Sequence, residues 1–133
     1  MRLQGRVALI SGAARGIGAG IAERFREEGA QVLIADSDAG AGQATARRLG
    51  AGFIETDVSS KADMEEAVNE ALRLFGGLHI ILQNAGIFPW NLIENIDVEE
   101  WDRVLAVNLK SAFVAAKAAL PVMKAQAYGR MVF

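Results

Sequence analysis

The sequence predicts an α/β fold in which repeated βαβ units build a parallel sheet. Short apolar runs alternate with longer stretches of helical period, which is the pattern of such units. The first apolar run also passes directly into a glycine-rich segment, "VALISGAARGIG", residues 7–18. The 133 residues, 52% of them hydrophobic, can bury one core of ordinary domain size. We therefore expect one domain, or part of one.

Five apolar runs predict the strands. They are Val7–Ser11, Gln31–Asp36, Gly52–Asp57, His79–Gln83 and Arg130–Phe133. Because consecutive parallel strands need a crossover connection, the stretches between them are expected to be helical. The region around Pro89 is the one long loop that we expect.

The first two helices follow the first two strands. The first is expected to begin near residue 17 and to end at Gly29, with an apolar stripe made of Ile17, Ile21, Ala22 and Phe25. The second covers residues 38–49 and contains Gly40 and Gly42, which lower its helix propensity.

The third helix has clear start and stop signals. Ser60 and Asp63 form a capping box at its start, and Gly76 and Gly77 close it. One apolar stripe runs between them, made of Met64, Ala67, Val68, Ala71, Leu72 and Phe75.

Helical periodicity returns at Asp97 and continues to about Leu120. Its apolar stripe consists of Trp101, Val104, Leu105, Leu109, Ala112, Phe113, Ala116 and Leu120. Asn108 shares a face with the first three of these, where a core residue is expected. A buried amide without partners costs about 1–3 kcal/mol, so Asn108 must be hydrogen-bonded. One interpretation is that it binds helix carbonyls and stabilises a kink.

Composition excludes several classes of function. Acidic residues number 16 and basic residues 14, with no block of like charge, so no nucleic-acid or anionic-membrane surface is expected. Cysteine is absent, which removes disulfides and thiolate metal sites and suits a cytoplasmic protein, and no metal site is expected. The first apolar run stops after Ile10, too short for a signal peptide, and no later run approaches membrane-spanning length.

The glycine-rich segment predicts an anion site. A strand that turns at once into a helix leaves free backbone N–H groups at the positive end of the helix dipole. Gly12 permits the sharp turn, Gly16 removes a Cβ where a pyrophosphate would lie, and Gly18 lets the helix pack tightly on the strand. The alternative is a glycine-rich turn without a ligand.

An acid at the end of the second strand adds to this prediction. Asp36 lies near the offset at which dinucleotide folds place a carboxylate against the adenosine ribose. Such a carboxylate would bind the ribose hydroxyls and repel a 2′-phosphate, which favours NAD over NADP, whereas Arg15 could reach an added phosphate. Asp36 could instead cap the following helix. Asp57 has the same ambiguity, as a turn residue or as an acceptor for the adenine amino group.

Five motifs stand in order along the chain: "SGAARGIG" (residues 11–18), Asp36, "DV" (57–58), "QNAG" (83–86) and "VNL" (107–109). Together they resemble the short-chain dehydrogenase/reductase family. The resemblance implies a Rossmann-type doubly wound sheet of order 3-2-1-4-5, truncated after the fifth strand. It also implies binding of NAD or NADP, and hydride transfer between nicotinamide and an alcohol or ketone.

The resemblance assigns roles to individual residues. Those on the pyrophosphate and nicotinamide side match Ser11, Gly12, Ile17 and Gly18. Those that meet adenine match Asp57 and Val58, and those beside the ribose match Asn84, Ala85 and Gly86. The resemblance makes Asn108 a catalytic residue that holds a water of the proton relay.

The sequence departs from the family in two places and lacks its reaction centre. His79 stands where the family has an aspartate, and Gln83 replaces the first asparagine of "NNAG". We assign His79 no chemistry. The family's tyrosine is followed four residues later by a lysine, but Tyr128 is followed by Val132, and Ser111 lies in a helix instead of after the fifth strand.

These observations predict that residues 1–133 are the N-terminal, cofactor-binding part of a Rossmann domain, inactive without a C-terminal catalytic part. The expected substrate is a small alcohol or carbonyl compound. The resemblance implies a homodimer or homotetramer. The alternative is a non-catalytic dinucleotide-binding or interaction module.

Overall fold

All 133 residues are described by the computed structural model, and five parallel strands form a single sheet in the order β3-β2-β1-β4-β5. The strands are β1 (Val7–Ser11), β2 (Gln31–Asp36), β3 (Gly52–Glu55), β4 (Ile80–Gln83) and β5 (Arg130–Val132). The helices are α1 (Gly16–Glu27), α2 (Ala39–Leu49), α3 (Lys61–Phe75), η1 (Ile93–Asn95), α4 (Val98–Leu105), η2 (Ala106–Lys110) and α5 (Ser111–Ala125). The predicted fold class and strand order are confirmed.

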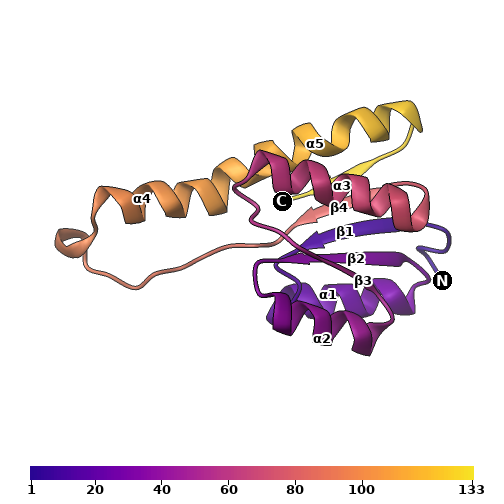
Figure 1. Cartoon of the computed structure of the whole chain (residues 1–133), viewed down its shortest axis with the longest axis horizontal. Helices are drawn as coiled ribbons and strands as arrows, with labels where there is room; N and C mark the ends of the chain where they lie inside the picture. Colours follow the sequence, from indigo (N-terminus) through magenta and orange to yellow (C-terminus); the bar gives the residue numbers. More distant parts are fainter.

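Helices cover both faces of the sheet. In Figure 1, α1 and α2 lie against one face and α3 and α5 against the other, while α4 projects beyond the edge of the sheet. This is the doubly wound arrangement, in which the carboxyl ends of the strands meet at one edge.

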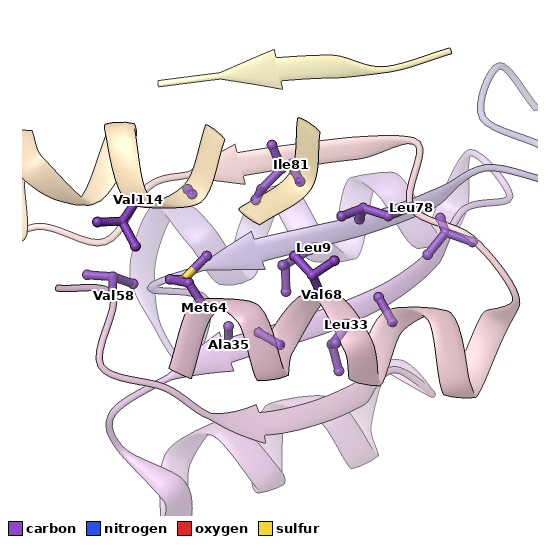
Figure 2. Close-up of a cluster of buried hydrophobic side chains, with 14 of the residues drawn as sticks. Leu9, Leu33, Ala35, Val58, Met64, Val68, Leu78, Ile81 and Val114 are labelled. Carbon is purple, nitrogen blue, oxygen red and sulfur yellow. The ribbon is translucent and has the colours of Figure 1, made fainter. Parts of the chain in front are cut away.

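Each face of the sheet buries its own core. Alternate residues of β1 point to opposite sides, as the two-residue period of a strand requires. Leu9 packs with Leu33, Met64 and Val68 beneath α3 and α5, as Figure 2 shows. Ile10 belongs to the smaller cluster beneath α1 and α2. Packing on both faces of the sheet fixes the positions of the carboxyl ends of the strands relative to one another.

Strand ends differ slightly from the prediction for β3 and β4, and β5 stops one residue earlier. The sequence predicts a strand over residues 52–57, but β3 ends at Glu55. Thr56 still donates its amide to the Asp36 carbonyl at 3.0 Å, whereas the Asp57 amide donates to the Asp63 carboxylate at 2.9 Å. Side-chain capping of α3 therefore ends the ladder. His79 lies just before β4 and not within it.

Glycine and cap residues place the helices as expected, with two adjustments. The Ser60 hydroxyl accepts the Asp63 amide hydrogen at 3.2 Å, and Gly76 ends α3 in the left-handed conformation. The Asp63 carboxylate binds the Ser60 hydroxyl and not its amide, so the capping box is one-sided. Gly42 lies within α2 because a Cβ there would overlap the Phe53 ring. Ile17, expected on the buried stripe of α1, is 77% exposed.

The predicted buried face of residues 98–120 is wrong. Trp101, Leu105 and Phe113 are largely exposed, whereas the buried positions are Val107, Ser111, Val114, Ala115, Ala119 and Met123. The segment η2 is a π-helix that joins α4 to α5. A π turn takes more residues than an α turn, so it shifts the phase of the pattern that follows.

The continuous helix Val98–Ala125 also extends beyond the predicted end near Leu120. By length and composition it could cross a membrane, with a mean hydropathy of 1.3 in its most apolar window. The core helix of a soluble protein can meet the same criterion, and α5 packs on α3 and β4. This segment is therefore weak support for a membrane span.

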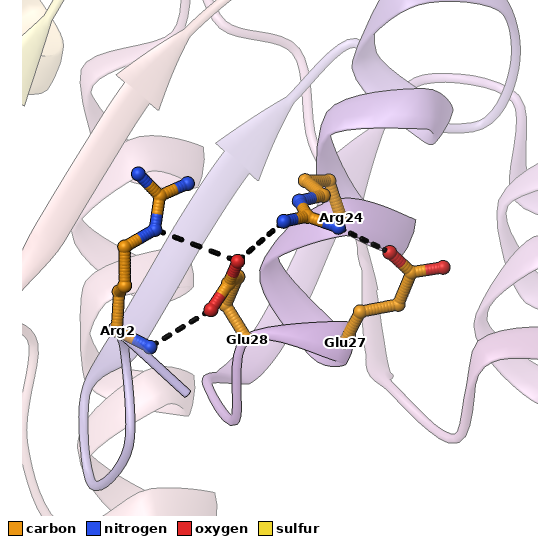
Figure 3. A network of polar contacts seen from close by, with 4 residues as sticks. All are labelled: Arg2, Arg24, Glu27 and Glu28. Carbon is orange, nitrogen blue, oxygen red and sulfur yellow. Dashed lines mark hydrogen bonds and ion pairs between the residues drawn. The ribbon is translucent and has the colours of Figure 1, made fainter.

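The N-terminus is fastened to the end of α1. The Arg2 amide donates to the Glu28 carboxylate at 2.8 Å, and the Arg24 guanidinium pairs with both Glu27 and Glu28 (Figure 3). The Arg2 amide, assisted by the Arg24 charge, lowers the pKa of Glu28. These contacts lie at the opposite end of β1 from the glycine-rich turn.

His79 has a structural role. Its Nδ1 accepts the Val7 amide hydrogen at 3.1 Å, which requires an unprotonated nitrogen. Burial, with a smaller contribution from the Arg6 charge, lowers the pKa of His79. The neutral imidazole therefore satisfies an amide at the start of β1.

We expect the free energy of unfolding to decrease as the pH falls below about 6.5, because the unfolded chain then binds a proton at His79 that the folded chain excludes. The variant His79→Gln, which keeps an acceptor for Val7, should flatten this slope. Urea denaturation between about pH 5 and 7.5 measures it. Equal slopes for the two proteins would contradict the assignment.

Candidate functional site

A cleft of about 290 Å³ opens at the carboxyl ends of β2, β1 and β4, where the strand order reverses. It is lined by Gly12, Ala14, Arg15, Asp36, Ser37, Thr56, Asp57, Val58, Asn84, Ala85, Gly86, Ile87, Arg103 and Val107. We refer to this space as the cleft.

Most of the predicted cofactor residues line the cleft. They are Gly12, Arg15, Asp36, Asp57, Val58, Asn84, Ala85 and Gly86. The predicted residues outside its lining are Ser11, Gly16, Ile17, Gly18 and Asn108. Ser11, Gly18 and Asn108 nevertheless bind or pack against residues that line it. Ile17 and Gly16 are exposed at the start of α1.

Six lining residues are not predicted from the sequence: Ala14, Ser37, Thr56, Ile87, Arg103 and Val107. Five of them, all but Arg103, are chain neighbours of predicted residues, so their proximity could have been anticipated. Ala14 lies within the quoted glycine-rich segment itself. Arg103 carries no local signal, because its position depends on where α4 lies relative to the strand ends.

The glycine turn has no room for side chains at two points. Gly12 has φ of +63°, and a Cβ there would lie 2.7 Å from the Ala85 Cα. A Cβ on Gly18 would lie 2.2 Å from the Gly12 carbonyl oxygen. Gly16 faces open space, and a Cβ added there would meet no atom within 4 Å. The predicted roles of Gly12 in the turn and Gly18 in helix packing are confirmed.

The start of α1 can receive an anion. Arg15 occupies the N-cap position without a side-chain cap, and the first turn holds no acidic residue. The first N–H groups of a helix have no partner within it, and they lie at the positive end of the dipole. A phosphate group is the kind of ligand that fits such a position.

Asp36 holds the glycine turn in place. Its carboxylate accepts the Ala14 amide hydrogen at 2.9 Å and the Asp38 amide hydrogen at 3.0 Å. The Thr45 hydroxyl of α2 also binds the turn, since it donates to the Ala14 carbonyl at 2.7 Å. A carboxylate has about four acceptor sites, so Asp36 keeps capacity toward the cleft. The turn is therefore fixed before any ligand binds.

The helix-cap interpretation of Asp36 is wrong, because Asp38 caps α2. The Asp38 carboxylate accepts the Ala41 amide hydrogen at 2.9 Å and pairs with the Arg15 guanidinium at 2.6 Å. The Ala41 amide, followed by Arg15, lowers the pKa of Asp38. The cation that could have met a 2′-phosphate is thus paired with a carboxylate.

Asp57 occupies the other side of the cleft as an ionised turn residue. Its carboxylate accepts the Ser59 hydroxyl at 2.7 Å and the Ser59 amide hydrogen at 2.9 Å, and these bonds lower the pKa of Asp57. The Arg103 guanidinium approaches it at 4.0 Å. Val58 beside it is buried. An apolar side chain and a polar rim suit the edge of a flat heteroaromatic ring.

The loop after β4 is joined to the glycine turn. The amides of Asn84 and Ala85 both donate to the Ser11 hydroxyl oxygen at 3.1 Å. The Asn84 side-chain amide donates to the Gly12 carbonyl at 3.1 Å. These bonds bring two segments more than 70 residues apart into one rigid wall.

Asn108 does not lie in the core and does not bind helix carbonyls. Its Oδ1 accepts the Ile87 amide hydrogen and its Nδ2 donates to the Ile87 carbonyl, each at 2.8 Å. The side chain is exposed and extends from the π turn to the loop after β4. The expected pairing of this amide is confirmed, whereas its expected burial and helix-carbonyl partners are wrong.

The cleft combines cations, carboxylates and backbone donors. No group of three or more His, Cys, Asp or Glu residues is placed to hold a metal ion. The arrangement suits a ligand that carries both phosphate groups and hydroxyl or amino groups.

Comparison with known proteins agrees with this chemistry. A family model described as short chain dehydrogenase matches residues 6–133. The chain is 43% identical to tropinone reductase-like 1 of Erythroxylum coca, over 99% of this chain and 51% of that protein. It is 42% identical to galactitol 2-dehydrogenase of Agrobacterium fabrum (97% and 51%) and 39% identical to a 3-alpha-(or 20-beta)-hydroxysteroid dehydrogenase of Mycobacterium tuberculosis (98% and 51%). The chain spans about half the length of these relatives.

Proposed function

The chain belongs to the short-chain dehydrogenase family, as the five motifs indicated, and from this premise we propose that the protein is an NAD-dependent oxidoreductase. Residues 1–133 supply its cofactor-binding part. The reaction is hydride transfer between the nicotinamide and a small alcohol or ketone. The observation that carries the proposal is the glycine turn, which has no room for a Cβ at Gly12 or Gly18 and is held by Asp36 at the cleft where the strand order reverses.

The residues present fit a nicotinamide dinucleotide. The uncapped start of α1 would receive the diphosphate, and Asp36 would accept hydrogen bonds from the adenosine ribose. The hollow beside Asp57 and Val58 would take adenine, and Asn84 to Gly86 would lie beside the second ribose. The nicotinamide supplies the hydride chemistry when bound.

We propose NAD in preference to NADP. A 2′-phosphate would approach the Asp36 carboxylate, whose charge repels it. Arg15, the nearest cation in the glycine turn, is already paired with Asp38. Both electrostatic effects favour the cofactor with a free 2′-hydroxyl.

Calorimetry should show that NADH binds at least about tenfold more tightly than NADPH, and that Asp36→Ala narrows this ratio. A hydrogen bond to a charged group contributes about 1.5–3 kcal/mol, and 1.4 kcal/mol is a factor of ten. Asp102→Ala, which removes an exposed carboxylate on α4, is the control and should leave the ratio unchanged. A tighter NADPH complex, or an unchanged ratio in Asp36→Ala, would refute the role of Asp36. Absence of any dinucleotide binding would refute the oxidoreductase proposal and leave only an interaction module.

Turnover is not expected from residues 1–133 alone. They contain no tyrosine followed four residues later by lysine, which the family uses as its proton donor. The substrate-polarising serine and this pair would have to come from residues outside 1–133.

We further propose a cytoplasmic homodimer or homotetramer. The absence of cysteine suits a reducing compartment. The support for association is an exposed apolar face on α4, η2 and α5, made of Trp101, Leu105, Leu109, Phe113 and Leu120. Exposed apolar faces of this kind mark interaction sites.

A further inference from the structure

Three polar side chains form a buried chain beneath the cleft. Ser11, at the end of β1, is 2% exposed, Gln83, at the end of β4, is 9% exposed, and Ser111, the first residue of α5, is 1% exposed. The Ser11 hydroxyl donates to Gln83 Oε1 at 2.8 Å, and Gln83 Nε2 donates to the Ser111 hydroxyl at 3.0 Å. Gln83 therefore connects the first strand to the long helix through the interior.

The partners of Ser11 and Ser111 determine the donor and the acceptor in each hydrogen bond that joins them to Gln83. The Ser11 oxygen accepts the amides of Asn84 and Ala85, so its hydrogen is free for Gln83. The Ser111 oxygen accepts from Gln83, and its own hydrogen goes to the Val107 carbonyl. An amide side chain is needed at position 83, because it offers an acceptor at one oxygen and a donor at the adjacent nitrogen.

The far end of the chain lies in the π turn. The Ser111 amide donates to the Ala106 carbonyl, the i−5 residue, instead of to Val107, the i−4 residue of an ordinary helix. The Ser111 hydroxyl supplies a donor to Val107 in its place. Asn108 directly follows Val107 in the sequence, and its side chain binds both backbone groups of Ile87 at 2.8 Å.

We propose that Gln83 is a positioning residue that sets the place of Asn108 relative to the glycine turn. One end of its hydrogen-bonded chain fixes the wall formed by Ser11, Asn84 and Ala85, and the other end fixes the turn from which Asn108 reaches Ile87. The proposal rests on the proposed function for its catalytic consequence. The structural part of the proposal depends only on the hydrogen bonds of Ser11, Gln83, Ser111 and Asn108 described above.

The structural part is tested by Gln83→Met, which keeps the approximate volume and removes both hydrogen bonds, in the protein expressed from its complete gene. Amide hydrogen exchange of Ile87 reports the Asn108 contact, and that of Leu33 in β2 reports the stability of the core. Val32→Ala, a cavity variant on the α1 and α2 face, is the control that lowers stability without removing these hydrogen bonds.

We expect Gln83→Met to accelerate Ile87 exchange at least about fivefold more than Leu33 exchange, whereas Val32→Ala should accelerate Leu33 exchange at least as much as Ile87 exchange. Ser111→Ala should reproduce the effect, and the double variant should be no worse than either alone, since all three break the same connection. Equal acceleration of Ile87 and Leu33 in Gln83→Met, or additive effects of the two substitutions, would overturn the proposal.

The catalytic part is tested by kinetics of the same variants. Gln83→Met should lower kcat about tenfold to a hundredfold, as misplacement by about an ångström does, while the Kd for NADH changes less than threefold. Val32→Ala should leave kcat within twofold. A kcat of Gln83→Met equal to that of Val32→Ala would overturn the positioning role. If the unsubstituted protein neither binds NADH nor turns over, the proposed function fails, and the exchange result still decides the connection.

Discussion

Replacing Gly18 with alanine is expected to abolish detectable NADH binding and to lower the free energy of unfolding by about 1–3 kcal/mol. The added Cβ would lie 2.2 Å from the Gly12 carbonyl oxygen and 2.7 Å from the Asn84 side-chain nitrogen. The first of these atoms belongs to the backbone of the glycine turn, so relief requires α1 to move away from β1. That movement displaces the N–H groups proposed to receive the diphosphate.

Gly20→Ala is the matched control for this variant. Gly20 lies on the same helix, and a Cβ there meets nothing within 4 Å. Alanine in an exposed helical position is expected to raise stability by about 0.5–1 kcal/mol and to leave NADH affinity unchanged. Urea denaturation and calorimetry on both variants measure the difference. NADH binding by Gly18→Ala within threefold of the unsubstituted protein would show that the turn tolerates the methyl group and would contradict this view of the site.

The strands could be predicted because their signal is local. Runs such as Val7–Ser11 and Gln31–Asp36 have continuous apolar interiors, VALI and VLIA, which is typical of strands buried on both faces. The end of β3 could not be predicted, because it depends on the Asp63 carboxylate binding the Asp57 amide, a contact between a helix cap and a turn.

The prediction of the buried face of the long helix failed for a different reason. Helical periodicity is constant only where the number of residues per turn is constant, and the π turn at Ala106–Lys110 changes that number. Residues before and after it therefore follow different phases. Ser111 has no role in the sequence prediction because it lies inside a helix, yet it is among the most buried polar residues in the chain.

The candidate site likewise contains some residues whose convergence could be predicted and others that only the tertiary structure places there. Gly12, Asp36 and Asn84 could be predicted to converge, because the carboxyl ends of parallel strands meet at one edge. Arg103 enters the cleft only because of where α4 lies relative to the strand ends. That placement is a tertiary feature, and no spacing in the sequence encodes it.

Asn108→Ala is expected to lower kcat about a hundredfold while changing the Kd for NADH much less. Asn108 joins the π turn to the Ile87 backbone through one accepted and one donated hydrogen bond. Ile87 and Gly86 both line the cleft, next to Asn84 and Ala85. Removing the amide therefore frees the loop at the proposed nicotinamide side, whereas the phosphate and adenosine contacts remain.

Two further variants test whether the loss of activity comes from the contact between Asn108 and Ile87 or from removing an asparagine in general. Asn108→Asp keeps an acceptor for the Ile87 amide but places a carboxylate against the Ile87 carbonyl, so it should lose nearly as much activity as alanine. Asn69→Ala, an exposed asparagine on α3, should keep kcat within twofold. Steady-state kinetics with calorimetric Kd values give the comparison. If Asn108→Asp retains full activity, the bond donated to Ile87 has no role in catalysis, and only the accepted bond would still support placing Asn108 in the reaction.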